Sequence, residues 1–319
     1  MSHDHEIQHL SELDRRRFLQ IAGFATGLAF VNSITLNESA HALPSAKLPG
    51  FTAFANSVKV FKSDKYYLVE SSGIPAHQMM VGIRSWQQQV PTVQNYSGTN
   101  AWSIPIKPVI ATNPMSARNH FLRGAIALAV NGVPIFNALN NRGDDAFLAG
   151  ELDEWGGHCG RADDYHYHIA PTHLQSVVGK KVPIAYALDG FPIYGETEID
   201  GKKVTGLDSL NGHFDSKKNY HYHATKSYPY INGGFKGMVT EIDGQVDPQA
   251  LTKGFRPAGT PLKGATITGF ERISDSSFDL KYSLNGGEFR VKYTASLKEV
   301  SMEFIDSNGT SRTEVYQRK

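Results

Sequence analysis

One part of the chain repeats itself, and this internal duplication limits the fold more than any other feature of the sequence. Residues 126–136 read IALAVNGVPIF, and residues 184–194 read IAYALDGFPIY. Each segment is an apolar run, an Asn-Gly or Asp-Gly pair and a second run around a Pro, a pattern that predicts a β-hairpin. The Pro favours an edge position for the returning strand. Both copies continue to a Gly-His pair and a Tyr-His-Tyr-His run, so we expect repeated units at about 126–168 and 184–223.

The rest of the sequence predicts a mainly β fold. Short apolar runs such as 58–61 and 66–69 alternate with turn residues, and proline is frequent between them. Residues 262–319 hold further hairpin patterns with Asn-Gly turns. We therefore expect a hairpin-rich β domain with the internal repeat at 43–255, followed by a small C-terminal β unit at 262–319 that serves in packing, as a lid or in partner contact.

The first 42 residues predict an export signal. Residues 15–19 read RRRFL, an apolar stretch follows at 21–31, and residues 40–42 read AHA. Two adjacent arginines, a spacer and Phe-Leu form the pattern of twin-arginine signals, and the apolar stretch is too short to span a bilayer comfortably. We expect the twin-arginine export machinery as a partner, cleavage after Ala42, a periplasmic or secreted location, and no membrane span after cleavage. Because this route carries folded proteins, a metal ion can be acquired before export.

Charge and cysteine content argue against two classes of protein. The formal net charge is +1, so there is no basic surplus to neutralise phosphates, and we expect no nucleic-acid partner. Cys159 is the single cysteine, which excludes an intramolecular disulfide framework. Because Phe214 takes its place in the second copy, we interpret Cys159 as a buried apolar residue rather than a ligand that both copies need, with an asymmetric or redox-sensitive first site as the alternative.

The repeated motif carries the chemistry of the chain. Each copy is Gly-His, a six-residue spacer and Tyr-His-Tyr-His; the spacers share no identity, whereas every His and Tyr is kept. Side chains at i and i+2 of a strand project from the same face about 6.5–7 Å apart. The two His of each run therefore point together, and the two Tyr pack on the opposite face. The candidate metal ligands are His158, His166, His168, His213, His221 and His223.

These histidines predict a transition-metal site. Two imidazoles on one strand face can converge on an ion at about 2.0–2.1 Å per bond, with the His after each Gly as a third ligand. Ligation by imidazole alone suits Zn, Cu, Fe or Ni. Two sites of three His each and one site shared between the copies both fit the pattern. If a coordination position stays open, the protein becomes a candidate metal-dependent hydrolase or oxidoreductase; the sequence alone leaves open whether it is an enzyme.

Two metal-free interpretations compete with this hypothesis. In one, the chain is a binding module for a small molecule or a cell-envelope polymer, with Tyr, Phe and Trp side chains as contact platforms. In the other, the histidines and tyrosines form a hydrogen-bond network that is purely structural.

Several other polar residues have a structural expectation beside a functional one. We expect His77 and His173 to be packing or surface residues, with accessory metal ligation as the alternative, and His120 to have no role in the site. Asp163 and Asp164 fit a turn, with the orientation of imidazole rings as the alternative. Asp153 is expected in a solvated loop, although Asp208 occupies the matching position of the second copy.

At these residues the sequence resembles the YHYH domain family. The resemblance covers roughly 50–250, and the C-terminal β unit lies outside it. It implies an exported bacterial protein with this β domain, and it implies no particular reaction, because the family name describes a sequence pattern. The segments that carry it are Gly156 to His158, Tyr165 to His168, Asp189 to Gly195, Leu207 to His213, Tyr220 to His223 and Tyr228 to Tyr230.

Overall fold

The protein, described by a computed structural model at residues 44–84 and 86–318, is mainly β. Among these residues the single α-helix is the short α1 (Gln175–Val178), and three 3₁₀ turns are present, η2 (Phe51–Phe54), η3 (Gly98–Asn100) and η4 (Thr172–Leu174). The expected fold class is therefore confirmed. The export signal expected at 1–42 lies outside the described residues. No helix of the described part has the length and hydropathy that a membrane-spanning segment needs.

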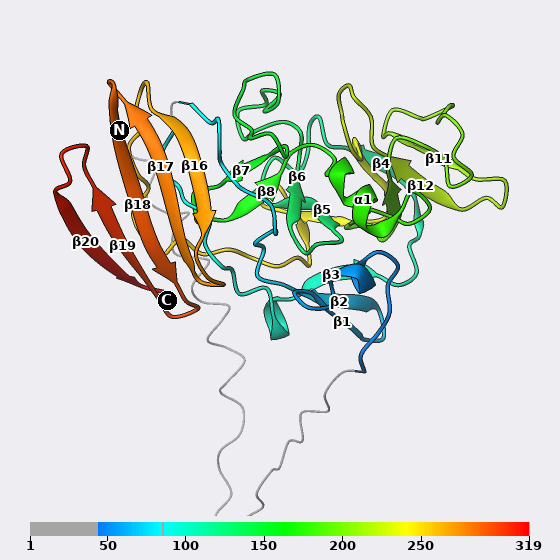
Figure 1. Cartoon of the computed structure of the whole chain (residues 1–319). Coiled ribbons are helices and arrows are strands. Elements are labelled where there is room, and N and C mark those ends of the chain that lie inside the picture. The colour runs from blue at the N-terminus through cyan, green and yellow to red at the C-terminus, as the bar shows by residue number, and fades with distance from the viewer. Residues whose placement is uncertain (1–43, 85, 319) are drawn as a thin grey trace, which may run out of the picture. The chain divides into compact units, whose positions relative to one another are not determined.

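The internal repeat builds an eight-stranded sheet with a symmetric strand order. Figure 1 labels the strands of the first copy near the middle of the view and the two outer strands of the second copy at the right. The order is β11-β12-β10-β9-β5-β6-β8-β7, with β5 and β9 antiparallel at the centre. Moving outward on each side, the returning hairpin strand comes first, then the Tyr-His strand, then the Gly-His strand. Each copy thus contributes one half of the sheet. The bounds are β5 (Ala125–Ala129), β6 (Pro134–Phe136), β7 (Gly157–Cys159), β8 (Tyr165–Tyr167), β9 (Ala185–Ala187), β10 (Pro192–Tyr194), β11 (Gly212–Phe214) and β12 (Tyr220–His223).

The expected edge position of the returning hairpin strands is wrong. β6 lies between β5 and β8, and β10 lies between β9 and β12. A proline is tolerated there because each one is the first residue of its strand, where its missing N–H interrupts no ladder. On the outer side, β6 pairs with β8 only at Ile135, and β10 pairs with β12 from Ile193 onward.

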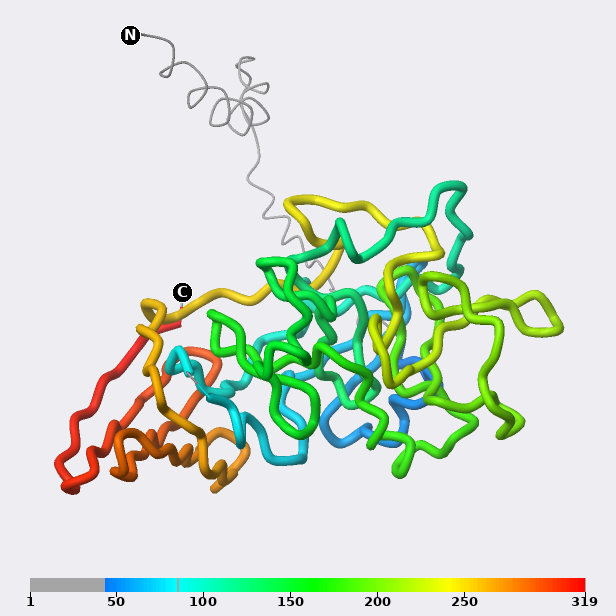
Figure 2. The backbone as a smooth tube through the Cα atoms, turned by 90° about the horizontal axis from the view of Figure 1, so that it is seen from above, coloured from blue at the N-terminus to red at the C-terminus, as the bar shows by residue number. Residues whose placement is uncertain are grey.

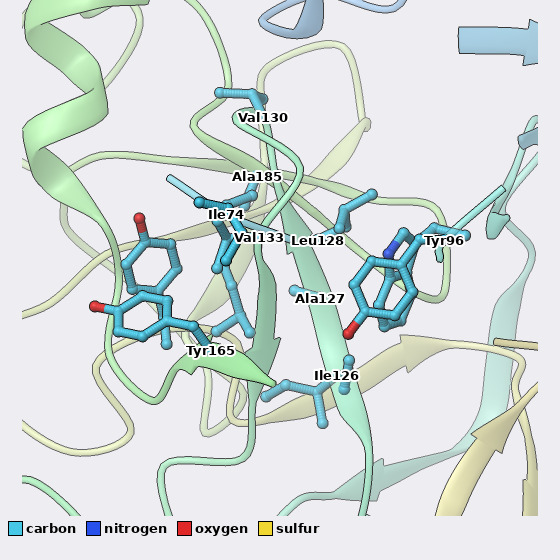
Figure 3. Close-up of a cluster of buried hydrophobic side chains, with 14 of the residues drawn as sticks. Ile74, Tyr96, Ile126, Ala127, Leu128, Val130, Val133, Tyr165 and Ala185 are labelled. Carbon is cyan, nitrogen blue, oxygen red and sulfur yellow. The ribbon is translucent and has the colours of Figure 1, made fainter. Parts of the chain in front are cut away.

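The centre of the sheet is buried on both faces. All five residues of β5 are buried, and a strand of this kind reads as a continuous apolar run without alternation. Figure 3 shows Ile126 and Leu128 of this strand in a cluster that also holds Tyr96 and Tyr165. Tyr165 comes from the Tyr-His-Tyr-His run, so the tyrosine side of this motif faces the core.

Smaller sheets accompany the central one. They are β1 (Lys59–Lys62), β2 (Tyr66–Glu70) and β3 (Trp102–Pro105); β4 (Ile110–Ser116) with β13 (Gly234–Gly237); and β14 (Thr240–Ile242) with β15 (Gln245–Asp247). In β3 the side chains alternate between buried and partly buried, as expected for a strand with one face on a core.

The C-terminal strands form a five-stranded antiparallel meander, in which each strand pairs with the next (Figure 1). In Figure 2 they are the orange to red part of the tube. Within the same compact unit, Tyr293 donates a hydrogen bond to the carbonyl of Pro91 at 2.6 Å, and the rings of Tyr282 and Trp86 lie 5.1 Å apart. The meander therefore packs on the loop at 86–91. Its strands are β16 (Thr266–Arg272), β17 (Ser277–Leu284), β18 (Gly287–Ala295), β19 (Glu299–Ile305) and β20 (Ser311–Gln317).

Candidate metal centres

The six candidate histidines gather in two separate groups, one built by each copy of the repeat. The first centre is His158, His166 and His168; the second centre is His213, His221 and His223 together with Glu198. Within each group the potential ligand atoms lie within 4.8 Å of one another. Of the two arrangements that the sequence left open, the described residues therefore adopt two groups of three His. Four strands lie between β8 and β12, and the five spacings of about 4.8 Å correspond to roughly 24 Å.

Strand register brings the histidines of each centre together. His158 lies opposite His166 in the β7–β8 pair, and His213 lies opposite His221 in the β11–β12 pair. The third His follows two residues after the second and so projects from the same face. Close packing explains the glycine that precedes the first His. A Cβ at Gly157 would lie 2.6 Å from the hydroxyl of Tyr165, so a larger residue would displace the tyrosine layer.

Hydrogen bonds fix the tautomer of the three rings in the first centre. An Nδ1 that faces a carbonyl oxygen must carry the hydrogen, which leaves Nε2 of a neutral ring with its lone pair. All three Nε2 atoms of the first centre are therefore free to bind a metal ion. The Nδ1–H groups donate to backbone carbonyl oxygens, His158 to Glu151 at 3.1 Å, His166 to Asp164 at 3.0 Å and His168 to Asn137 at 2.6 Å.

Two of these lone pairs meet in the first centre. The Nε2 atoms of His158 and His168 lie 3.0 Å apart. Burial lowers the pKa of His168 to about 3, and burial with the neighbouring rings lowers the pKa of His158 well below its usual range. Neither ring therefore holds the proton that would make this contact a hydrogen bond. An ion bound at about 2.0–2.1 Å to both nitrogens in tetrahedral geometry would set them about 3.3 Å apart, close to the observed spacing.

The second centre repeats this geometry. The Nε2 atoms of His213 and His221 lie 3.1 Å apart. Burial lowers the pKa of both His221 and His223. The Nε2 of His223 is fully buried and has no hydrogen-bond partner. The Nδ1–H groups of two rings again donate to backbone carbonyl oxygens, His213 to Thr205 at 3.0 Å and His223 to Gly195 at 2.8 Å. The His221 ring has a hydrogen bond with the backbone of Asn219.

Glu198 adds a carboxylate to the second centre, and sequence reasoning missed it. Its oxygens lie 3.3 Å from Nε2 of His213, 3.8 Å from that of His221 and 3.6 Å from that of His223. Three lone pairs and a carboxylate thus converge, and a cation satisfies all four at once. Aligning the two copies gives no signal for this ligand, because the first copy has no carboxylate at the matching position.

The matching residue in the first copy is Asn140. The hairpins are offset by 58 residues, from 126 to 184. This offset relates Asn137 to Gly195, and their backbone carbonyls accept the Nδ1–H groups of His168 and His223, respectively. The same offset relates Asn140 to Glu198. The side chain of Asn140 is turned into its own loop. Its oxygen accepts the backbone N–H groups of Arg142 and Asp144, and its amide donates to Glu151.

The tyrosines of the motif form a separate network on the other face of the strands. Tyr165 donates to the carboxylate of Asp153 at 2.8 Å, and Tyr220 donates to Asp208 at 2.9 Å. Tyr222 donates to Asp189 at 2.6 Å. The expectation of a solvated loop is wrong for Asp153, which is buried because it accepts this bond and three backbone N–H groups.

The other histidines have partners outside the two centres. His77 stacks on Trp155 with ring centroids 4.7 Å apart, its Nε2 accepts the hydroxyl of Tyr167 at 2.7 Å, and the His173 ring lies 5.1 Å from it. These two rings therefore pack in an aromatic cluster, as expected. His120 pairs with Glu241 at 2.7 Å.

The spacer of the first copy is also structural. Asp163 is buried and receives Arg256 in an ion pair at 2.7 Å. The backbone carbonyl of Asp164 accepts a hydrogen bond from Nδ1–H of His166, and the carboxylate of Asp164 lies 3.3 Å from the same nitrogen. Asp164 therefore orients this imidazole ring. Cys159 is buried, as the sequence predicts.

Comparisons with known proteins agree with the motif. No curated protein and no solved structure matches the chain. Residues 101–203 match the sequence model of a family described as YHYH protein. This match is narrower than the roughly 50–250 of the resemblance; it includes all histidines of the first centre and ends before His213. The predicted resemblance is confirmed over residues 101–203, which are similar to the YHYH family.

Proposed function

We propose that this protein binds two transition-metal ions, one at each centre. The observation that carries the proposal is the pair of short Nε2–Nε2 contacts, 3.0 Å and 3.1 Å, between rings whose other nitrogens donate to backbone carbonyls. Two lone pairs at this distance repel each other, and a shared cation turns the repulsion into attraction. Zn, Cu, Fe and Ni all accept imidazole ligands.

The tyrosine network supports metal binding over a purely structural role for the histidines. Tyr165 and Tyr220 are satisfied by carboxylates on the core side of the strands. Neither hydroxyl needs a motif histidine as its partner. A structural network would give the Nε2 atoms donors of their own, whereas the fully buried Nε2 of His223 has none.

Metal analysis of the purified chain tests this proposal. We expect about two equivalents of metal in protein purified without chelators, about one equivalent after H166A and H168A together, and none after H221A and H223A are added. H120A is the matched control, because His120 lies outside both centres, and it should keep two equivalents. The proposal fails if the wild-type chain holds no stoichiometric metal or if the quadruple variant still holds it.

We propose in addition that the chain is exported by the twin-arginine route, which rests on the RRRFL sequence at 15–19. Replacing Arg15 and Arg16 by Lys should retain the precursor in the cytoplasm, and the exported wild-type protein should begin at Leu43. Mass spectrometry of periplasmic and culture fractions checks both. Export of the Lys variant at the wild-type level would refute the route.

A further inference from the structure

The two centres differ in one ligand. In the second centre Glu198 faces all three Nε2 atoms, whereas Asn140, its counterpart in the first, turns away into loop hydrogen bonds. Among the described residues, the potential ligands of the first centre are three imidazoles alone. The duplication has therefore kept the histidines and changed the fourth position.

This difference changes the charge at each centre. A divalent ion held by three neutral imidazoles keeps a net charge of +2, whereas the Glu198 carboxylate reduces it to +1. A buried charge without a compensating ligand costs several kcal/mol. The carboxylate of Asp164 lies near the first centre, but it lies behind His166, 3.3 Å from Nδ1, and so cannot occupy the coordination position that faces Nε2.

In the described part of the chain, an apolar side chain lies beside the histidines of the first centre. The ring of Phe136 stacks on His166 with centroids 3.8 Å apart and an interplanar angle of 10°. Its counterpart in the second copy is Tyr194, which has a hydroxyl. Phenylalanine adds neither a donor nor an acceptor, so it forms an apolar wall. His158 is partly exposed, as is its counterpart His213 in the second centre, so solvent reaches the edge of both centres.

We infer that the two centres have different tasks: the first is an open site that takes a small anion as an exchangeable ligand of its metal ion, and the second is closed by Glu198. This inference rests on the proposed metal binding. Closed four-ligand sites are typical of structural metals, and three protein ligands with an open position are typical of reactive ones. Hydroxide, azide and carboxylates belong to the class of anion that the first centre would take.

Cobalt substitution with azide as the probe tests the inference. The full chain is stripped with a chelator and reloaded with Co²⁺, and its visible absorption is followed during an azide titration. The variant H213A/H221A retains the first centre, and the variant H158A/H166A retains the second. We expect azide to bind the first centre at least about tenfold more tightly than the second, which corresponds to about 1.4 kcal/mol.

Glu198→Ala, made in the variant that retains the second centre, should open this centre and create an azide response. Glu196→Ala is the matched control, since Glu196 is an exposed glutamate two residues away, and it should leave the second centre silent. Circular dichroism verifies that each variant is folded.

The outcomes separate the two proposals. Absence of Co²⁺ uptake by the wild-type chain refutes metal binding and this inference with it. Cobalt uptake at both centres with equal azide affinity, or without any azide response at the first centre, overturns the division of tasks alone. A silent Glu198→Ala second centre that still holds Co²⁺ overturns the assignment of Glu198 as the closing ligand.

Discussion

Removal of Asp153 should destabilise the protein far more than removal of Asp208, although the two occupy the same position of the repeat. The carboxylate of Asp153 is buried and accepts four hydrogen bonds, from Tyr165 and from the backbone N–H groups of Met80, Trp155 and Gly157. The carboxylate of Asp208 accepts three hydrogen bonds, from the hydroxyl of Tyr220 and from two backbone N–H groups, and its side chain is 35% exposed.

The expected magnitudes follow from these contacts. A hydrogen bond to a charged group contributes about 1.5–3 kcal/mol, and a buried donor without a partner costs about 1–3 kcal/mol. Burial raises the pKa of Asp153, so desolvation of the carboxylate offsets part of the gain. We expect Asp153→Ala to lower the free energy of unfolding by about 4 kcal/mol. Asp208→Ala should cost about 1–2 kcal/mol, because water can reach the released donors.

Urea denaturation of the metal-free protein at pH 7, followed by circular dichroism, measures both losses. Tyr165→Phe is the matched control, because it removes one of the four bonds and should cost about 1 kcal/mol. Equal losses for Asp153→Ala and Asp208→Ala would refute the reasoning, since they would mean that burial does not decide the energetic weight of this position.

Three further predictions concern pH and metal. Burial lowers the pKa of His77 to about 4, so the stability that His77 contributes is present above pH 6.5 and is lost as the pH falls toward 4. The variant His77→Gln should reduce this loss of stability at acid pH by about 2 kcal/mol. Parallel curves of melting temperature against pH for the variant and the wild-type chain would contradict this prediction. Burial raises the pKa of Asp189 to about 6, so between pH 3.8 and 6 this carboxyl holds a proton in the folded state that it has lost in the unfolded state. The free energy of unfolding therefore falls as the pH rises through this range. The variant Asp189→Asn should abolish this pH dependence in urea titrations. A metal ion present at about 100 times its dissociation constant stabilises the folded chain by about 2.7 kcal/mol per site. Chelation should therefore lower the melting temperature of the wild-type chain and of H120A alike, and should leave the variant without both centres unchanged.

Much of the architecture could be predicted because it depends on local periodicity. The alternation in Tyr165 to His168 places histidines and tyrosines on opposite faces of a strand, and the structure has them there. The Asn-Gly and Asp-Gly pairs mark the hairpins of the sheet, and the polar alternation of 262–319 marks the strands of the meander. Each of these features is decided by residues close together in the sequence.

Features that depend on distant parts of the chain could not be predicted in this way. Pro134 suggested an edge strand, but the position of β6 is decided by its parallel pairing with β8, which comes later in the chain. The burial of Asp153 depends on the backbone of Met80, 73 residues away. A short acidic pair in a loop carries no local sign of such a partner.

Glu198 illustrates why the chemistry of the second centre is harder to predict than its geometry. Strand register places the histidines of both centres. Packing of Tyr165 and Tyr220 on the core side keeps this register the same in the two copies. The fourth position lies on the loop after each hairpin, where either Asn140 or Glu198 leaves the strands intact. Packing therefore constrains the imidazoles in both copies and leaves the carboxylate free to differ. A duplicated sheet with a variable loop ligand can change the charge of one proposed metal centre without changing the fold of either copy.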